Sequence, residues 1–268
     1  MKTCALLRLP ANWEACDDDA ARLLVGSGDK QQDKAALEAQ ARRIGELQQM
    51  LYAQQKQKLL VILQGMDGAG KDRSIAASFA YCNMMGLRAK SFKAPTPQEL
   101  AHDFLWRVHA ETPACGQIGI FNRSHYEDVL VPRVHGQLDA AACRQRYTHI
   151  RAFESLLAES GTRILKIFLH ISQREQARRL QERLQDPEKQ WKFDPSDLRE
   201  RGQWKLYQQA YADALHASDA EHAPWHIVPA DNKPQRNLAV SCLIAETLAD
   251  MQPAWPAFRP ELAQIKVE

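Results

Sequence analysis

The chain has 268 residues, of which 45% are hydrophobic and 25% charged, a composition that excludes disordered and collagen-like classes. Its 35 basic and 33 acidic residues leave a formal charge of +2, so no global field predicts binding to nucleic acid or to a membrane surface. The longest apolar run, residues 59–63, is too short to cross a bilayer. The six cysteines lack zinc-ligand spacing and indicate free thiols in a reducing compartment, so we expect a cytoplasmic protein.

The first 58 residues are predicted to form an irregular arm followed by a helix. Apolar residues recur at helical spacing over residues 37–51, and polar residues between them indicate a face exposed to water. We expect this helix to pack on the edge of a domain that covers residues 59–268. Its exposed face is also a candidate contact between copies of the chain.

From residue 59 onward, short apolar runs alternate with helix-like stretches. Continuously apolar runs predict strands that are covered on both faces. The predicted strands are residues 59–63, 118–121, 164–169 and 226–228, with residues 88–92 as a candidate for a further strand. The predicted helices that separate them are residues 74–85, 97–110, 140–160 and 172–185. This alternation is typical of a three-layer α/β domain with a mainly parallel sheet.

A long insertion separates the last two predicted strands. It begins with a helix at Ser172, where Ser172 and Glu175 form a capping-box pattern. A second helix follows Pro195 and carries its aromatic residues on one face. Two helices joined by a loop of Lys, Trp and Phe predict a hinged lid at about residues 172–222. A plain helical hairpin packed in the core is the alternative.

Residues 65–71 read Gly-Met-Asp-Gly-Ala-Gly-Lys, which matches the G-x-x-x-x-G-K pattern of a P-loop, or Walker A motif. The loop follows the first predicted strand directly and opens a helix, so its backbone amides can surround phosphate oxygens. Lys71 adds a full positive charge. The other residues that we expect to contact phosphate are Gly65, Met66, Gly68, Ala69, Gly70 and Asp72.

Two acids distinguish this loop from most phosphate loops. Asp67 lies inside the loop, where a carboxylate repels phosphate unless a divalent cation lies between them. Asp72 stands where most such loops carry a Ser or Thr that binds magnesium. Asp67, and in second place Asp72, are therefore predicted magnesium positions. Helix capping is the alternative, and it fits Asp72 better.

A second polar segment, residues 122–128, follows the predicted strand 118–121. The carboxyl ends of strands are where α/β sheets bind ligands, so these side chains are expected in the site. Arg123 can stabilise the charge that develops on a transferred phosphoryl group. Asn122 replaces the usual strand-end aspartate, with Glu127 and Asp128 a turn later as candidate metal ligands.

Five stretches together resemble the polyphosphate kinase 2 family, P-loop phosphotransferases that use inorganic polyphosphate to phosphorylate nucleotides. They are residues 61–73, 91–107, 116–132, 178–194 and 224–238. The Asn-Arg-Ser-x-Tyr-Glu sequence is similar to the class III subgroup, which accepts both AMP and ADP. The resemblance implies a P-loop kinase-like fold with a helical lid, a homo-oligomer, and Mg²⁺ or alternatively Mn²⁺ as cofactor. It also implies polyphosphate and adenine or guanine nucleotides as substrates.

The resemblance also assigns roles to individual residues. The expected catalytic residues are Asp67, Lys71, Arg123 and Arg178, and the expected metal ligands are Asp67, Glu127 and Asp128. Weaker candidates for binding polyphosphate or nucleotide phosphates are Lys93, Arg133, Lys192 and Arg236, with solvated surface charges as the equal alternative. The chain departs from the family at Lys205, Pro234 and Gln235, which leaves the acceptor preference open.

The predicted reaction is the reversible transfer of the terminal phosphoryl group of polyphosphate to ADP or AMP, which makes ATP or ADP. An ATP-dependent nucleoside monophosphate kinase is one alternative, and it would be inert with polyphosphate alone. A non-catalytic nucleotide-binding scaffold is the other. The combination of Asp67, Lys71, Arg123 and Glu127 argues against the scaffold, because a site without chemistry has no need for that charge cluster.

Overall fold

The computed structural model describes residues 2–260, 262, 265 and 267. Five parallel strands form one sheet in the order β2-β3-β1-β4-β5. The strands are β1 (Lys58–Gln64), β2 (Leu87–Ser91), β3 (Ile118–Asn122), β4 (Thr162–His170) and β5 (Trp225–Pro229). The four predicted strands, the candidate further strand and the predicted α/β class are confirmed.

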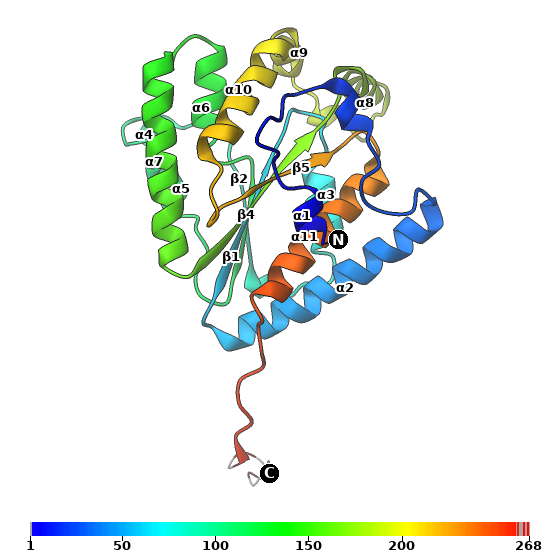
Figure 1. The fold of residues 1–268 in the computed structure, drawn as a ribbon, viewed down its shortest axis with the longest axis vertical. Helices are drawn as coiled ribbons and strands as arrows, with labels where there is room; N and C mark the ends of the chain where they lie inside the picture. Colours follow the sequence, from blue (N-terminus) through cyan, green and yellow to red (C-terminus); the bar gives the residue numbers. More distant parts are fainter. Residues whose placement is uncertain (1, 261, 263–264, 266, 268) are drawn as a thin grey trace.

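Helices cover both faces of the sheet, which explains why the strands are apolar on both sides (Figure 1). One face carries α2 (Lys30–Gln54), α3 (Lys71–Ser78) and α11 (Lys233–Asp250), and the other carries α6 (Glu127–Val134), α7 (Ala140–Glu159) and α10 (Trp204–Ser218). The remaining α-helices are α1 (Thr3–Leu6), α4 (Pro97–Leu100), α5 (Trp106–His109), α8 (Gln173–Gln185) and α9 (Pro195–Gly202). The short 3₁₀ helices are η1 (Asp17–Ala21), η2 (Met84–Gly86) and η3 (Gln190–Lys192).

The N-terminal segment is more ordered than the predicted irregular arm. The amide of Leu9 donates to the carbonyl of Trp225 at 2.9 Å, and the amide of Ile227 donates to the carbonyl of Leu7 at 2.8 Å. Leu7, Leu9 and Trp13 are all buried. The segment thus covers the outer edge of β5 and closes that side of the sheet.

Helix boundaries differ from the prediction where local caps intervene. The helix expected over residues 37–51 is confirmed, but it begins at Lys30 because the Asp29 side chain accepts from the amides of Gln31 and Gln32. The helix expected over residues 97–110 is instead two short helices, α4 and α5. The predictions missed α6 and α11.

The predicted lid divides into two parts of different character. In α10, Trp204, Tyr207, Tyr211 and Leu215 are buried, and the helix packs against α6 and α7. Of the two expectations for this segment, these contacts of α10 resemble the helical hairpin packed in the core. The segment between α8 and α10 exposes Trp191 to 77% and remains the candidate lid.

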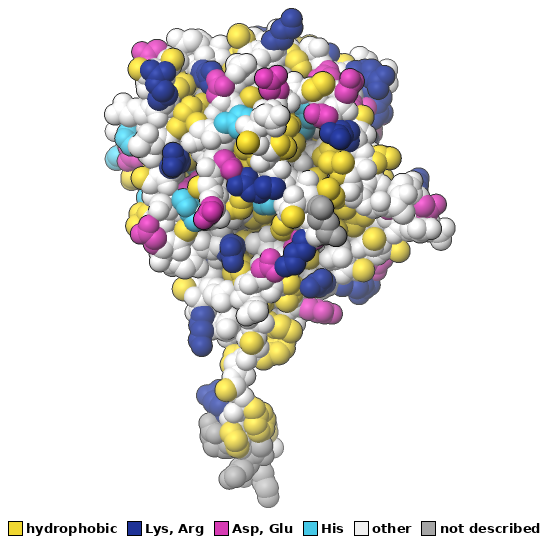
Figure 2. Space-filling view, in the orientation of Figure 1, with side chains coloured by type: hydrophobic (Ala, Val, Ile, Leu, Met, Phe, Trp, Pro, Cys, Tyr) yellow, Lys and Arg dark blue, Asp and Glu magenta, His cyan; other side chains and the backbone are white. Residues whose placement is uncertain are grey.

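The described surface shows acidic and basic side chains interspersed on the face drawn in Figure 2, in keeping with the small net charge. After Pro253 the chain extends away from the body (Figure 1), and it exposes Trp255 and Phe258 to 59% and 79%. Within the described residues, no helix is both long and apolar enough to span a bilayer.

A fully buried ion pair links the sheet to α7 beneath the polar segment 122–128. Lys166 Nζ lies 2.7 Å from the Glu154 carboxylate and donates to the Tyr126 hydroxyl at 3.0 Å. Both charged side chains have 0% exposure. Since removing one partner leaves the other charge uncompensated in the core, this pair is expected to be sensitive to single substitutions.

We therefore expect Lys166→Ala to lower the free energy of unfolding by about 3–5 kcal/mol, measured by urea denaturation. The control is Arg42→Ala, which breaks the exposed 2.8 Å pair with Glu38 and should change stability by less than about 1 kcal/mol. Equal, small effects for both variants would contradict the stabilising role of the buried pair.

Candidate active site

The predicted phosphate loop lies between the carboxyl end of β1 and the first turn of α3. Gly70 adopts a φ of 104°, which favours glycine, and a Cβ atom there would lie 2.2 Å from Nη1 of Arg236. The Ala69 carbonyl faces Arg236, so the amide at the other end of the same peptide group points the opposite way. The loop therefore has the conformation that a phosphate-binding cradle requires.

Lys71 occupies the centre of this loop. Its side chain is buried, and Nζ donates to the carbonyl of Gly65 at 2.6 Å and to that of Met66 at 3.3 Å. Burial lowers the pKa of Lys71, and the negative charge of Asp67 offsets part of that shift. The ammonium group is thus held by carbonyls of its own loop.

Asp67, Arg123 and Glu127 surround Lys71. The guanidinium of Arg123 forms an ion pair with Asp67 and lies 3.6 Å from the Glu127 carboxylate. Arg123 adopts a left-handed φ of 62°, an uncommon conformation for this residue type that is often found at functional sites. Two predicted segments distant in sequence therefore meet in one cluster of alternating charge.

The two carboxyl groups of this cluster have opposite pKa shifts. Burial raises the pKa of Asp67, but the positive charges of Lys71 and Arg123 outweigh that effect and hold the pKa below its usual value. Burial raises the pKa of Glu127 above its usual value, although Arg123 and Lys71 oppose the shift. Asp67 is thus the more acidic of the two groups.

The donor set suits a divalent cation that a substrate phosphate helps to bind. Mg²⁺ usually binds proteins through one or two carboxylates together with phosphate oxygens and water. Asp67 and Glu127 flank Arg123 and can supply such carboxylates. Among the described residues no three acidic, His or Cys side chains gather as a ready-made metal site, so phosphate oxygens would complete the shell.

The other two acids lie elsewhere. Asp128 forms a 3.1 Å ion pair with Arg107, so the structure does not bring its carboxylate to the cluster as predicted. Asp72 is exposed at the start of α3, accepts from the side-chain amide of Asn122 at 2.5 Å, and lies 3.9 Å from Lys192 Nζ. An aspartate at position 122 would repel Asp72, whereas the neutral Asn122 donates a hydrogen bond to it. This contact explains why an asparagine is favoured at position 122.

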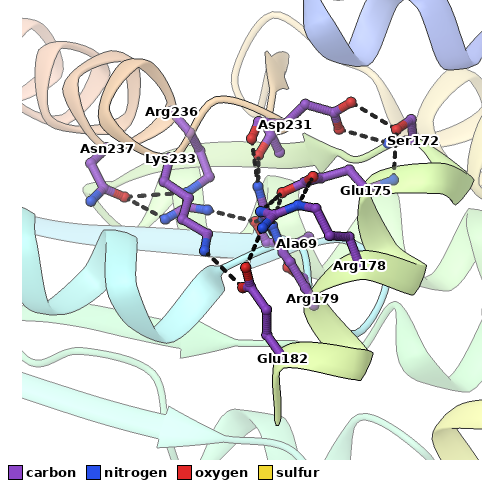
Figure 3. A network of polar contacts seen from close by, with 12 residues as sticks. Ala69, Ser172, Glu175, Arg178, Arg179, Glu182, Asp231, Lys233, Arg236 and Asn237 are labelled. Carbon is purple, nitrogen blue, oxygen red and sulfur yellow. Dashed lines mark hydrogen bonds and ion pairs between the residues drawn. The ribbon is translucent and has the colours of Figure 1, made fainter. Parts of the chain in front are cut away.

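Arg178 does not reach the phosphate loop. Its side chain is 51% exposed and pairs with Glu175 and Glu182 on the surface of α8 (Figure 3). Exposed pairs of this kind contribute little to stability. The predicted catalytic role of Arg178 would therefore require the side chain to leave both partners.

The adjacent Arg179 makes the contacts to the loop instead. It is buried, and its Nη1 donates to the carbonyls of Gly68 and Ala69 at 2.9 and 3.2 Å. Gln176, one turn earlier, donates to the carbonyl of Asp67 at 3.0 Å. The sequence prediction missed both residues, although their spacing of three places them on one helical face.

The weaker phosphate-binding candidates are dispersed. Arg133 pairs with Asp213 of α10, and Lys93 is exposed beyond the end of β2. Lys192 is exposed in the candidate lid. Arg236 is buried behind the loop, with 2% exposure, because it packs against Gly70. In this structure only Lys192 and Arg236 therefore lie near the loop.

Comparisons with known proteins agree on one family. The family model described as polyphosphate kinase 2 matches residues 27–256. An AMP/ADP-polyphosphate phosphotransferase of Meiothermus ruber is 50% identical over 87% of this chain and 88% of its own length. An ADP-polyphosphate phosphotransferase of Rhodopseudomonas palustris is 42% identical over 86% and 85%. The crystal structure of polyphosphate kinase 2 from Arthrobacter aurescens TC1 matches with a TM-score of 0.93 at 40% identity and covers 100% of this chain and 94% of that one.

Proposed function

The chain belongs to the polyphosphate kinase 2 family, and we propose that its cluster of Asp67, Lys71 and Arg123 transfers phosphoryl groups from polyphosphate to nucleotides. The protein is a polyphosphate-dependent kinase with a P-loop kinase-like fold, and its acceptor is ADP, AMP or both. The observation that carries the residue assignment is the Asp67–Arg123 ion pair beside the buried Lys71.

The reaction must bring two polyanions together. Two unit charges about 4 Å apart repel each other by about 4 kcal/mol at an effective dielectric constant of about 20, and several such pairs are present. Lys71 begins α3 and Arg123 follows β3, so two separate segments of the chain bring positive charge to the site. Their positions suit charge neutralisation at the junction between donor and acceptor.

The chemical step requires mainly positioning and charge stabilisation. A terminal phosphate oxygen of AMP or ADP attacks the terminal phosphorus of polyphosphate, and the bond from that phosphorus to its bridging oxygen breaks. The shortened polyphosphate keeps the electron pair of that bond. We assign Lys71 and the loop amides to binding one phosphate, and Arg123 to stabilising the charge on the phosphoryl group in transfer.

A divalent metal supports this reaction, and we propose that Asp67 and Glu127 hold Mg²⁺, with Mn²⁺ as an alternative. The metal supplies positive charge that neutralises the phosphate oxygens. The carboxylate of Asp67, which stays ionised at neutral pH because of its low pKa, orients Arg123 in the free protein. Asp128 is not included, because Arg107 holds its carboxylate elsewhere.

The function is tested by incubating the purified protein with Mg²⁺, long-chain polyphosphate and either AMP or ADP, without ATP. Chromatography is expected to show ADP and ATP, and chelation of the metal with EDTA should abolish both products. The ATP-dependent kinase alternative predicts no product without ATP. A reaction that needs ATP and ignores polyphosphate would contradict the proposed function.

We also propose a division of the chain into two segments and an association between copies of the chain. Residues 59–268 carry the proposed transferase domain, and residues 1–58 complete its core. The exposed apolar side chains of Trp255 and Phe258, which lie on the extended C-terminal segment, support contact with a second copy of the chain.

A further inference from the structure

Arg236, on the first turn of α11, lies directly behind the phosphate loop. Its guanidinium donates to the Ala69 carbonyl at 3.1 Å, to Ser74 Oγ at 3.0 Å and to the Asn237 side chain at 2.8 Å. Figure 3 shows Arg236 from α11 and Arg179 from α8 near Ala69. A cation therefore lies on the side of Gly70 that a Cβ atom would occupy.

Among the described residues, no carboxylate lies within ion-pair distance of this cation. Arg179 pairs with Glu175 at 2.7 Å, and Arg123 pairs with Asp67. For Arg236, by contrast, no ion pair forms within the described part of the chain, and all three acceptors are neutral groups. Burial lowers the pKa of Arg236, the neighbouring Arg179 and Arg73 lower it further, and the more distant Glu175 carboxylate offsets only part of that shift. A buried charge without an ion-pair partner destabilises a folded protein.

The acceptors do not require Arg236 for their own hydrogen bonding. The Ala69 carbonyl also accepts from Arg179 Nη1 at 3.2 Å. The Asn237 side-chain oxygen also accepts from Ser74 Oγ at 3.1 Å, which provides Ser74 with a partner as well. Removing the guanidinium would thus leave each of these groups with a hydrogen bond. The local structure alone does not explain why a charge is buried here.

The geometry links the charge to the phosphate site. The Ala69 carbonyl and the Gly70 amide are opposite ends of one trans peptide group, so a donor on the oxygen orients the N–H away from it. Hydrogen bonds in series also polarise one another, which strengthens the N–H as a donor. A cation on the Ala69 oxygen therefore favours an anion on the other side of the loop.

We propose that Arg236 is a positioning residue whose buried charge is balanced by the phosphate bound in loop 65–71. This inference rests on the proposed function, since it needs a polyanion in the loop. The free protein bears the unbalanced charge, and the bound phosphate compensates for it. Arg236 thereby increases polyphosphate affinity without touching the substrate.

The test compares Arg236→Met, which removes the charge, with Arg236→Lys, which keeps it. Isothermal titration calorimetry measures binding of magnesium tripolyphosphate, and thermal unfolding without ligand measures stability. We expect Arg236→Met to weaken tripolyphosphate binding by about 10- to 100-fold, a usual range for coupled sites. Its unfolding temperature should lie no more than about 3 °C below that of the unsubstituted protein. Arg236→Lys should bind within about threefold of the unsubstituted protein.

Steady-state kinetics distinguish a positioning role of Arg236 from a purely structural one. Arg236→Met should raise KM for polyphosphate while leaving KM for ADP unchanged, because its charge acts on the loop. The matched control is Arg174→Met, the same change at an exposed position of α8, which should alter neither affinity nor stability.

Three results would overturn the inference. They are unchanged tripolyphosphate binding in Arg236→Met, failure of that variant to fold, and binding by Arg236→Lys as weak as that of Arg236→Met. Failure of the proposed function itself would look different, because the unsubstituted protein would then neither bind tripolyphosphate nor make ATP from polyphosphate.

Discussion

Lys71→Ala is expected to lower turnover with polyphosphate and ADP at least about 100-fold while the fold stays intact. The reason is that Lys71 is the buried cation of the phosphate loop, and its loss removes the positive charge that we assign to binding a phosphate there. The measurement is the initial rate of ATP formation at saturating polyphosphate. Circular dichroism and thermal unfolding establish that the variant is folded.

The matched control for this prediction is Lys205→Ala, which removes the same side chain from an exposed position of α10. That variant should keep its rate within about twofold, because an exposed charge outside the loop is screened by solvent. If Lys71→Ala retained near-normal turnover, the loop would not be the site of transfer.

Asp67→Asn is expected to have an effect of similar size, at least about 100-fold on turnover. Asparagine has nearly the same shape and can still accept a hydrogen bond from Arg123, but it lacks the charge that Arg123 and a divalent metal require. Turnover should be measured over a range of Mg²⁺ concentrations, and the variant should need more metal than the unsubstituted protein.

Asp139→Asn is the control for Asp67→Asn, because Asp139 is exposed and caps α7. It should leave the metal dependence of turnover unchanged. An Asp67→Asn variant with normal turnover and normal metal dependence would show that the carboxylate serves only to orient Arg123.

Most of the sheet could be predicted from sequence because β1, β3, β4 and β5 are covered on both faces and are therefore mainly apolar, whereas the edge strand β2 is partly exposed. The same reasoning missed α11, since residues such as Val240 and Ile244 bury much of its circumference and leave a weak amphipathic pattern. It missed α6 because Pro132 lies inside that helix and is normally a signal of its end. The sequence could not show whether α10 belongs to a lid or to the core, because a helix face of aromatic residues suits either.

The central cluster could also be predicted, because P-loop chemistry and the strand-end segment each point to the same edge of the sheet. The sequence could not show which way individual side chains point. Arg178 and Arg179 are adjacent, yet neighbours on a helix differ by about 100°, so only one can face the loop. The pairing of Asp128 with Arg107 and the position of Arg236 behind Gly70 depend on tertiary contacts that no local pattern carries.

A crystal structure of the protein with magnesium and tripolyphosphate tests the central claim most directly. The proposed function predicts a phosphoryl group inside loop 65–71, within about 3.2 Å of Lys71 Nζ and of the Gly70 amide. Arg123 should then contact a phosphate oxygen rather than Asp67 alone. Tripolyphosphate bound at another place, with the loop empty and the Asp67–Arg123 pair unchanged, would contradict it.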